Sequence, residues 1–177
     1  MRYRERRPEE RMAYLRRLRQ IIEKRGSDNI VYVDESGFEA SSQRNHAWGL
    51  KGKRVHGEQS GNKRPRTSVI AGRRKQDWLA PMIYSGTANK MLVNRWFEDM
   101  LCRELRLNST IIWDNARFHS KVDLGAIAKR YGHVILFLPA YSPDFNPIEN
   151  DFAVIKTIRR NAPPDIKIDD IIKTYRC

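Results

Sequence analysis

The sequence predicts a mixed α/β domain in which helices cover the faces of one β-sheet. Runs rich in β-branched and aromatic residues indicate strands at residues 30–34, 67–73 and 78–84. Further along the chain, strand and helix patterns alternate, which is typical of α/β folds. The length of 177 residues is enough for one such domain with a hydrophobic core.

The N-terminal elements follow from their local patterns. Residues 8–25 are expected to form an amphipathic helix with Leu15, Leu18 and Ile22 on one face, and Gly26 is a natural stop. Residues 30–34 are expected to form a buried strand that ends in an acid. Residues 45–57 are expected to form a hairpin that turns at Leu50-Lys51-Gly52-Lys53.

The C-terminal half contains the alternating elements. In the helix expected at 88–106, the residues predicted to share a face are Met91, Leu92, Trp96, Met100 and Leu101. A strand at 110–114, a helix at 121–131 and a strand at 134–138 follow. A helix then begins at Pro147, with Asn146 as its N-cap. A short helix near 168–175 completes the chain.

The charge distribution predicts a polyanionic partner. The net charge is +13, and residues 44–75 carry ten basic side chains against Glu58 alone. Residues 1–30 carry ten basic and five acidic side chains. Clusters of one sign repel themselves unless a polyanion relieves the repulsion, so DNA-backbone binding is favoured over a solvated basic face. The candidate contacts are Arg44, Lys51, Lys53, Arg54, Lys63, Arg64 and Arg66, with Trp48 as a candidate for stacking on a base.

Other classes of protein are disfavoured. No apolar run approaches the roughly 20 residues that a membrane span needs, and the N-terminus has no apolar segment typical of a secretory signal. Cys102 and Cys177 make neither a disulfide framework nor a zinc pair. We therefore expect a cytoplasmic, nucleoid-associated protein.

Three carboxylates are the candidate catalytic and metal-binding residues. Asp34 and Asp114 each end an apolar strand, IVYVD and IIWD, so neighbouring strands would bring them together at the sheet edge. Two close carboxylates are unfavourable unless a cation lies between them, and oxygen ligands favour Mg²⁺ or Mn²⁺ over zinc. Glu149, in the first turn of the helix after Pro147, would complete a two-ion site. The alternative roles are turn caps for the aspartates and a capping carboxylate for Glu149.

Three motifs resemble the acidic motifs of DDE transposases, in particular the bacterial insertion-sequence branch of the mariner superfamily. The motifs are VDESGFE (33–39), WDNARFHS (113–120) and LPAYSPDFNPIEN (138–150). Asp114 and Glu149 are separated by 34 residues, the spacing of that superfamily, and HAWGLKGKRV (46–55) resembles its hairpin. Ala140 and Phe152 depart from the usual proline and tryptophan.

The resemblance implies a ribonuclease H-like fold, with a mixed five-stranded sheet flanked by helices. It also implies that Asp34, Asp114 and Glu149 bind two Mg²⁺ or Mn²⁺ ions. The implied reaction is hydrolysis at transposon ends, followed by strand transfer into target DNA. Other candidate site residues, with supporting or structural roles, are Glu35, Asn115 and His119. Asp151 lies about 200° around the helix from Glu149 and is expected to be structural.

The resemblance further implies double-stranded DNA as partner and a homodimer that acts on two ends. We expect residues 1–28 to form a basic linker helix and residues 29–177 to form the catalytic domain. The helix-turn-helix module of full-length relatives is not recognisable, and a separately encoded half is one explanation. Two alternatives remain open: a catalytically silent DNA-binding remnant, and a general ribonuclease H-like nuclease.

Overall fold

Five strands form one mixed sheet. The computed structural model describes residues 7–39, 48–54, 56, 66–116, 120–163 and 166–175. The strands are β1 (Ile30–Glu39), β2 (Arg66–Arg74), β3 (Asp77–Ser85), β4 (Thr110–Trp113) and β5 (Val134–Phe137), in the order β3-β2-β1-β4-β5. β1, β2 and β3 pair antiparallel, whereas β4 runs parallel to both β1 and β5. The predicted mixed sheet is therefore confirmed.

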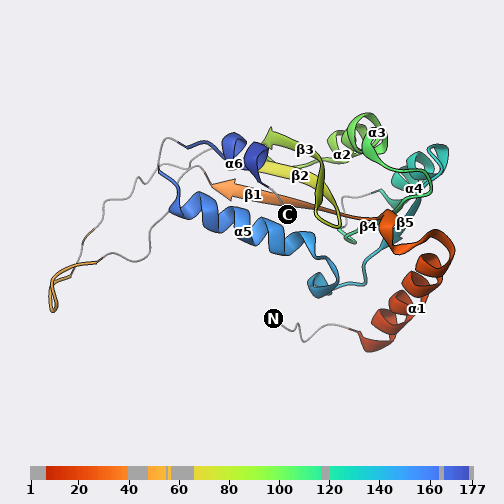
Figure 1. The fold of residues 1–177 in the computed structure, drawn as a ribbon, viewed down its shortest axis with the longest axis horizontal. Coiled ribbons are helices and arrows are strands. Elements are labelled where there is room, and N and C mark those ends of the chain that lie inside the picture. Colours follow the sequence, from red (N-terminus) through yellow and green to blue (C-terminus); the bar gives the residue numbers. More distant parts are fainter. Residues whose placement is uncertain are drawn as a thin grey trace.

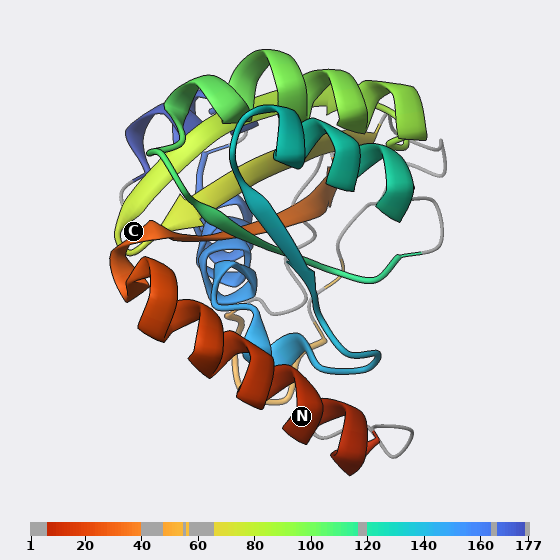
Figure 2. The ribbon, with the colours of Figure 1, turned by 90° about the vertical axis from the view of Figure 1, so that its right-hand side faces the viewer.

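Helices cover both faces of this sheet, giving three layers (Figures 1 and 2). One side carries α2 (Lys90–Trp96), the π-helical η2 (Phe97–Leu101), α3 (Cys102–Glu104) and α4 (Lys121–Arg130). The other side carries α1 (Pro8–Arg25), α5 (Ile148–Asn161) and α6 (Ile168–Thr174). Two short 3₁₀ turns, η1 (Ser27–Asn29) and η3 (Pro143–Phe145), precede β1 and α5.

Strand alternation divides the core between these two sides. Val31 and Val33 of β1 and Trp113 of β4 pack with α2, η2 and α4. Phe38 of β1 packs on the other side with α5 and α6. Tyr14 of α1 packs with Ile30, Ile112, Leu136 and Leu138, so α1 shares a core with the parallel strands. Successive residues of β1 therefore point to different helical layers.

The structure corrects several boundaries and faces. β1 does not end at Asp34 but continues to Glu39, because residues 34–39 still pair with β2 after the pairing with β4 has ended. In α1, Leu15 is 40% exposed, and the helix instead packs through Tyr14, Leu18, Ile21 and Ile22. The helix after the SPDFNP loop begins at Ile148 with Pro147 as its N-cap, one residue later than expected.

The helical stretch at 90–104 buries only part of the predicted face: Trp96 and Leu101 are 2% and 0% exposed. Met91 and Met100 are 77% and 37% exposed. Val93 and Phe97, which were not predicted, complete the buried face with Trp96, at positions i, i+4 and i+3. The π-helical turn at Phe97–Leu101 adds a residue to the local repeat, which shifts the phase of the residues after it.

The predicted hairpin at 45–57 falls only partly within the described residues. Lys53 N donates to Leu50 O at 2.9 Å, which confirms the turn. Its described flanks, Trp48–Leu50 and Lys53–Arg54, carry no strand, and residues 40–47, 55 and 57–65 lie outside the described part of the chain. Among the residues that the structure describes, no helix is long and apolar enough to cross a membrane.

Candidate metal centre

Asp34 and Asp114 lie side by side because β1 and β4 pair in parallel. The last paired residues are Val33 and Trp113, and each aspartate follows directly. Val33 and Trp113 point into the core beneath α2 and α4. Alternation therefore turns Asp34 towards the opposite layer, which contains α5, and Asp114 leaves β4 on the same side. Both aspartates are half-buried.

Glu149 comes to this region on the first turn of α5. Its backbone N–H donates to Asn146 O at 3.1 Å, which joins the SPDFNP loop to the helix start. The side chain is exposed, whereas its neighbours Ile148 and Asp151 are buried. The positive end of the helix dipole favours a carboxylate in this first turn.

The electrostatics of the three carboxylates are coupled. Burial, together with the negative charges of Asp114 and Glu149, raises the pKa of Asp34 to about 7, while a hydrogen bond from the Glu35 backbone opposes the shift. Burial also raises the pKa of Glu149, with Asp114 adding to the effect and Lys156 opposing it. Asp34 is thus costly to ionise unless a positive charge is nearby.

A pocket of about 240 Å³ opens beside the two aspartates. Asp34 and Asp114 line it together with Glu35, Ser36 and Tyr84, but Glu149 does not. Neighbouring carboxylates match the donor chemistry of Mg²⁺ or Mn²⁺. Within the described residues, however, no three His, Cys, Asp or Glu side chains are grouped so as to hold a metal ion.

Of the other candidate site residues, Glu35 lines the same pocket and Asn115 does not. Glu35 points to the opposite side of the sheet from Asp34, as expected from alternation, and its Oε2 accepts a hydrogen bond from Tyr84 Oη at 3.3 Å. Asn115 is exposed in the loop after β4. His119 lies outside the described residues. The contribution of Tyr84 was not predicted from the sequence.

The structure describes the side chains of four candidate DNA-contacting residues, and all four are exposed. Lys51, Lys53 and Arg54 are exposed, and Trp48 is fully solvent-accessible. Arg66 begins β2, but its side chain is outside the described set. Arg44, Lys63 and Arg64 also lie outside the described residues.

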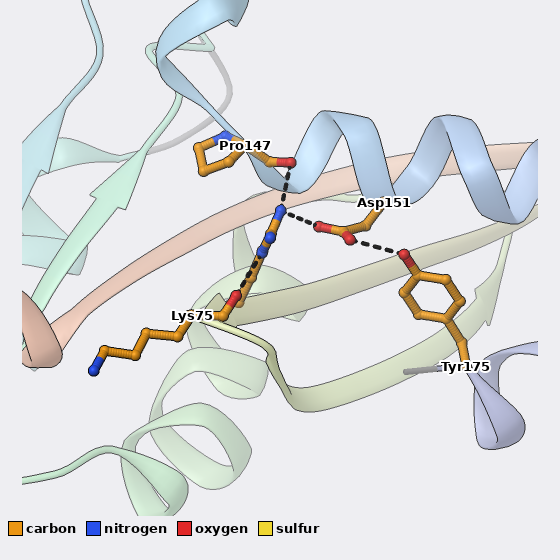
Figure 3. Close-up of polar contacts among 5 residues, drawn as sticks. Lys75, Pro147, Asp151 and Tyr175 are labelled. Carbon is orange, nitrogen blue, oxygen red and sulfur yellow. Dashed lines mark hydrogen bonds and ion pairs between the residues drawn. The ribbon is translucent and has the colours of Figure 1, made fainter. Parts of the chain in front are cut away.

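A network of polar contacts that the sequence did not predict holds the start of α5 (Figure 3). Arg73 of β2 donates through Nη1 to Asp151 Oδ2 at 2.7 Å and to Pro147 O at 2.9 Å. Its Nε donates to Lys75 O at 2.8 Å, and Tyr175 Oη donates to Asp151 Oδ1 at 2.8 Å. Asp151 is therefore structural, as expected.

A second contact joins the SPDFNP loop to α1. Arg11 donates to both carboxylate oxygens of Asp144, at 2.9 and 2.6 Å. The Arg11 guanidinium also lies 3.9 Å above the centre of the Phe145 ring, and that ring stacks on Tyr14. Arg11 and Asp144 are 133 positions apart in the sequence, which explains why no local pattern indicated this contact.

The fold is similar to that of several solved structures of the Mos1 transposase. In the Mos1 strand transfer complex the TM-score is 0.74 at 16% identity, with 93% of this chain and 51% of the Mos1 chain covered. The Mos1 mariner paired end complex with Mn gives 0.70 at 17% identity, with 93% and 52% covered. The Mos1 catalytic domain alone gives 0.60 at 14% identity, with 92% and 76% covered. These matches confirm the predicted ribonuclease H-like fold.

The chain spans about half the length of the Mos1 chains in the two complexes. A search of curated proteins finds no significant match. The family model of the DDE superfamily endonucleases matches residues 29–171, which is most of the chain. The chain therefore belongs to the DDE superfamily of endonucleases.

Proposed function

We propose that this chain is the catalytic domain of a transposase that cuts DNA strands and joins them to a target. The observation that carries the proposal is the pairing of β1 with β4, which puts Asp34 and Asp114 side by side in a DDE superfamily member. The raised pKa of Asp34, caused by burial and by Asp114 and Glu149, indicates a site suited to a cation. The 34-residue spacing to Glu149 supports the insertion-sequence branch of the mariner superfamily.

In this proposal Asp34, Asp114 and Glu149 hold two Mg²⁺ or Mn²⁺ ions. Such ions neutralise phosphate charge and stabilise the attacking and leaving oxygens of a phosphodiester exchange. The strands give Asp34 and Asp114 fixed positions, and α5 supplies Glu149 from the same side of the sheet. Some solved Mos1 structures contain Mg or Mn, which supports this choice of ions.

The partners belong to the same proposal. Double-stranded DNA is the substrate, in keeping with the net charge of +13 and with the exposed Lys51, Lys53 and Arg54. Residues 1–28, which include α1, act as a basic linker, and residues 29–177 form the catalytic domain. We also propose that the protein acts as a homodimer on DNA and that a helix-turn-helix half is encoded separately. Its proposed location is the cytoplasm, on the nucleoid.

Metal-dependent cleavage of DNA tests the proposal. A supercoiled plasmid that carries the gene with its flanking DNA is incubated with the chain and Mg²⁺ or Mn²⁺. Because each metal ligand contributes several kcal/mol to transition-state stabilisation, Asp114→Asn is expected to lower the cleavage rate by about 1000-fold or more. Asp99→Asn is the matched control, since Asp99 of η2 is exposed and forms an ion pair with Arg95 of α2.

Three other outcomes would contradict the proposal. Cleavage that survives Asp114→Asn would show that the assigned site is wrong. Salt-sensitive DNA binding by the wild type without any cleavage would indicate a DNA-binding remnant. Cleavage of the RNA strand of an RNA–DNA hybrid in preference to duplex DNA would indicate a general ribonuclease H-like nuclease.

A further inference from the structure

Asp151 is a buried carboxylate in the turn of α5 that carries Glu149. Its side chain is 7% exposed, and both of its oxygens accept hydrogen bonds, from Arg73 and from Tyr175. Burying an ion pair costs desolvation energy, and an apolar side chain is often at least as stabilising in such a place. A buried ion pair therefore does more to specify one arrangement of the chain than to stabilise the fold. Here that arrangement is the position of the first turn of α5.

The Arg73 guanidinium holds this turn on both sides of Glu149. Its Nη1 contacts the carbonyl oxygen of Pro147, two residues before Glu149, and the carboxylate of Asp151, two residues after it. Figure 3 shows Pro147 and Asp151 drawn to the same nitrogen. Because Nε of the same guanidinium donates to Lys75 O, the position of Nη1 is fixed, and its two contacts resist both sliding of the helix along its axis and rotation about it.

The same residue belongs to the strands that carry Asp34. Arg73 pairs across β2 and β1 with Tyr32, and Asp34 lies two residues further along β1. Residues two apart on a strand share a face, so the Arg73 contact lies on the face towards which Asp34 points. Two sets of contacts therefore fix Glu149 relative to Asp34. Backbone hydrogen bonds join β1 to β2, and the Arg73 side chain joins β2 to α5.

Tyr175 closes the network from the C-terminal side. Its hydroxyl donates a hydrogen bond to Asp151 Oδ1, the oxygen that Arg73 does not contact. Its ring packs edge-to-face on Trp78, with the ring centroids 5.5 Å apart. Trp78 in turn packs edge-to-face on Phe152 of α5, also at 5.5 Å. The chain after α6 thus helps to orient the Asp151 carboxylate.

We propose that Arg73, Asp151 and Tyr175 form a positioning clamp that sets Glu149 against Asp34 and Asp114 for metal binding. The clamp rests on the proposed function, because it acts through Glu149. Its residues are positioning residues, and they lie away from the pocket that Asp34 and Asp114 line. Groups that orient metal ligands typically change metal affinity or activity by about 10–100-fold when altered.

The test compares two neighbouring arginines of β2. Arg73→Lys keeps the charge but loses the planar group whose Nε, bound to Lys75 O, holds Nη1 in position. Arg74→Lys is the matched control, because Arg74 points to the other side of the sheet, where it contacts Glu104 O and Asp77. Asp151→Asn and Tyr175→Phe complete the set. Each variant is measured for Mn²⁺ affinity from free Mn²⁺ signals in electron paramagnetic resonance, for cleavage against Mn²⁺ concentration, and for urea stability.

Arg73→Lys and Asp151→Asn are expected to weaken Mn²⁺ binding by about 10–100-fold. Their maximal cleavage rate is expected to recover at saturating Mn²⁺. Tyr175→Phe, which removes one hydrogen bond, is expected to act in the same direction by a smaller factor. Arg74→Lys is expected to leave Mn²⁺ affinity unchanged even if stability falls.

The proposal is overturned if Arg73→Lys and Asp151→Asn lower urea stability but bind Mn²⁺ like the wild type. It is also overturned if Arg74→Lys weakens Mn²⁺ binding as much as Arg73→Lys, because the effect would then be a general loss of structure. Failure of the proposed function has a different signature. In that case the wild type shows no metal-dependent cleavage, or Asp114→Asn leaves cleavage intact.

Discussion

The two aspartates and the glutamate of the candidate site are held by different kinds of interaction. Asp34 and Asp114 extend from β1 and β4, whose positions are fixed by backbone ladders in the middle of the sheet. Glu149 lies on a helix whose start is held by side chains, through Arg73 and Asp151 on one side and Arg11 and Asp144 on the other. The positions of Asp34 and Asp114 change only when the sheet itself is disturbed. The position of Glu149 can be altered by substituting the side chains that hold the start of α5.

The largest effect is expected from a substitution that disturbs the sheet itself. Gly72 of β2 pairs with Val33, one residue before Asp34. A Cβ at Gly72 would lie 3.0 Å from Leu101 Cδ1 and 3.2 Å from Val31 Cγ1. Because these neighbours are fully buried, Gly72→Ala is expected to lower the free energy of unfolding by about 1–3 kcal/mol in urea titrations.

A second glycine provides the control for this prediction. Gly125 lies within α4, and a Cβ there would meet nothing within 4 Å. Gly125→Ala is therefore expected to raise stability by about 0.5–1 kcal/mol through helix propensity. Equal stability of Gly72→Ala and wild type would show that the sheet beside Asp34 is less tightly packed than the structure indicates.

A somewhat smaller effect is expected from the ionisation of Asp34 in metal-free buffer. Its pKa is about 7 in the folded chain, against an ordinary value of 3.8. The folded state then binds the proton more tightly than the unfolded state, so the contribution of Asp34 to stability is largest below about pH 4 and is lost as pH rises through 7. Asp34→Asn removes this loss. After allowance for partial solvent exposure, we expect it to raise stability at pH 8 by about 1–2 kcal/mol.

The comparison with Glu149 sharpens this result. The pKa of Glu149 is also raised, by burial and by Asp114, but its side chain is more exposed than that of Asp34. Glu149→Gln is thus expected to raise stability at pH 8 by less than Asp34→Asn does. Urea titrations of both variants at pH 5 and pH 8, with a chelator present, measure the difference. A larger gain from Glu149→Gln would reverse the proposed order of burial.

The aspartates were also the part of the site that the sequence predicted best. An apolar run that ends in an acid marks a buried strand leading to a carboxylate, and β4 ends directly before Asp114. Asp34 proved to lie within β1, because a local pattern does not show that β2 continues to pair after β4 has stopped. The carboxylate pair was nevertheless predicted, since it depends on the register of β1 and β4 and not on where β1 ends.

The contacts that hold Glu149 were not predictable in the same way. Arg73 and Asp151 are 78 residues apart, and Arg11 and Asp144 are 133 apart. Each of these residues occupies a position where a solvated charge would fit the local pattern equally well. The position of Asp151 around α5 did predict that it faces away from Glu149, but its partners follow only from the tertiary packing. Likewise, the exposure of Met100 was missed because the π-helical turn at Phe97–Leu101 changes the repeat.

The smallest effect is expected from the exposed contact on the other side of the SPDFNP loop. Asp144 is 54% exposed and Arg11 15% exposed, so solvent and salt screen their attraction. In a double-mutant cycle of Arg11→Ala and Asp144→Ala, measured by urea unfolding, we expect a coupling of at most about 1 kcal/mol that decreases in high salt. The Arg19–Glu23 pair, 84% and 64% exposed, is the matched control and should couple more weakly still. A coupling well above that range, insensitive to salt, would mean that α1 holds the loop as firmly as Arg73 holds the helix. Glu149 would then be fixed from both sides, and the contrast with the strand-borne aspartates would disappear.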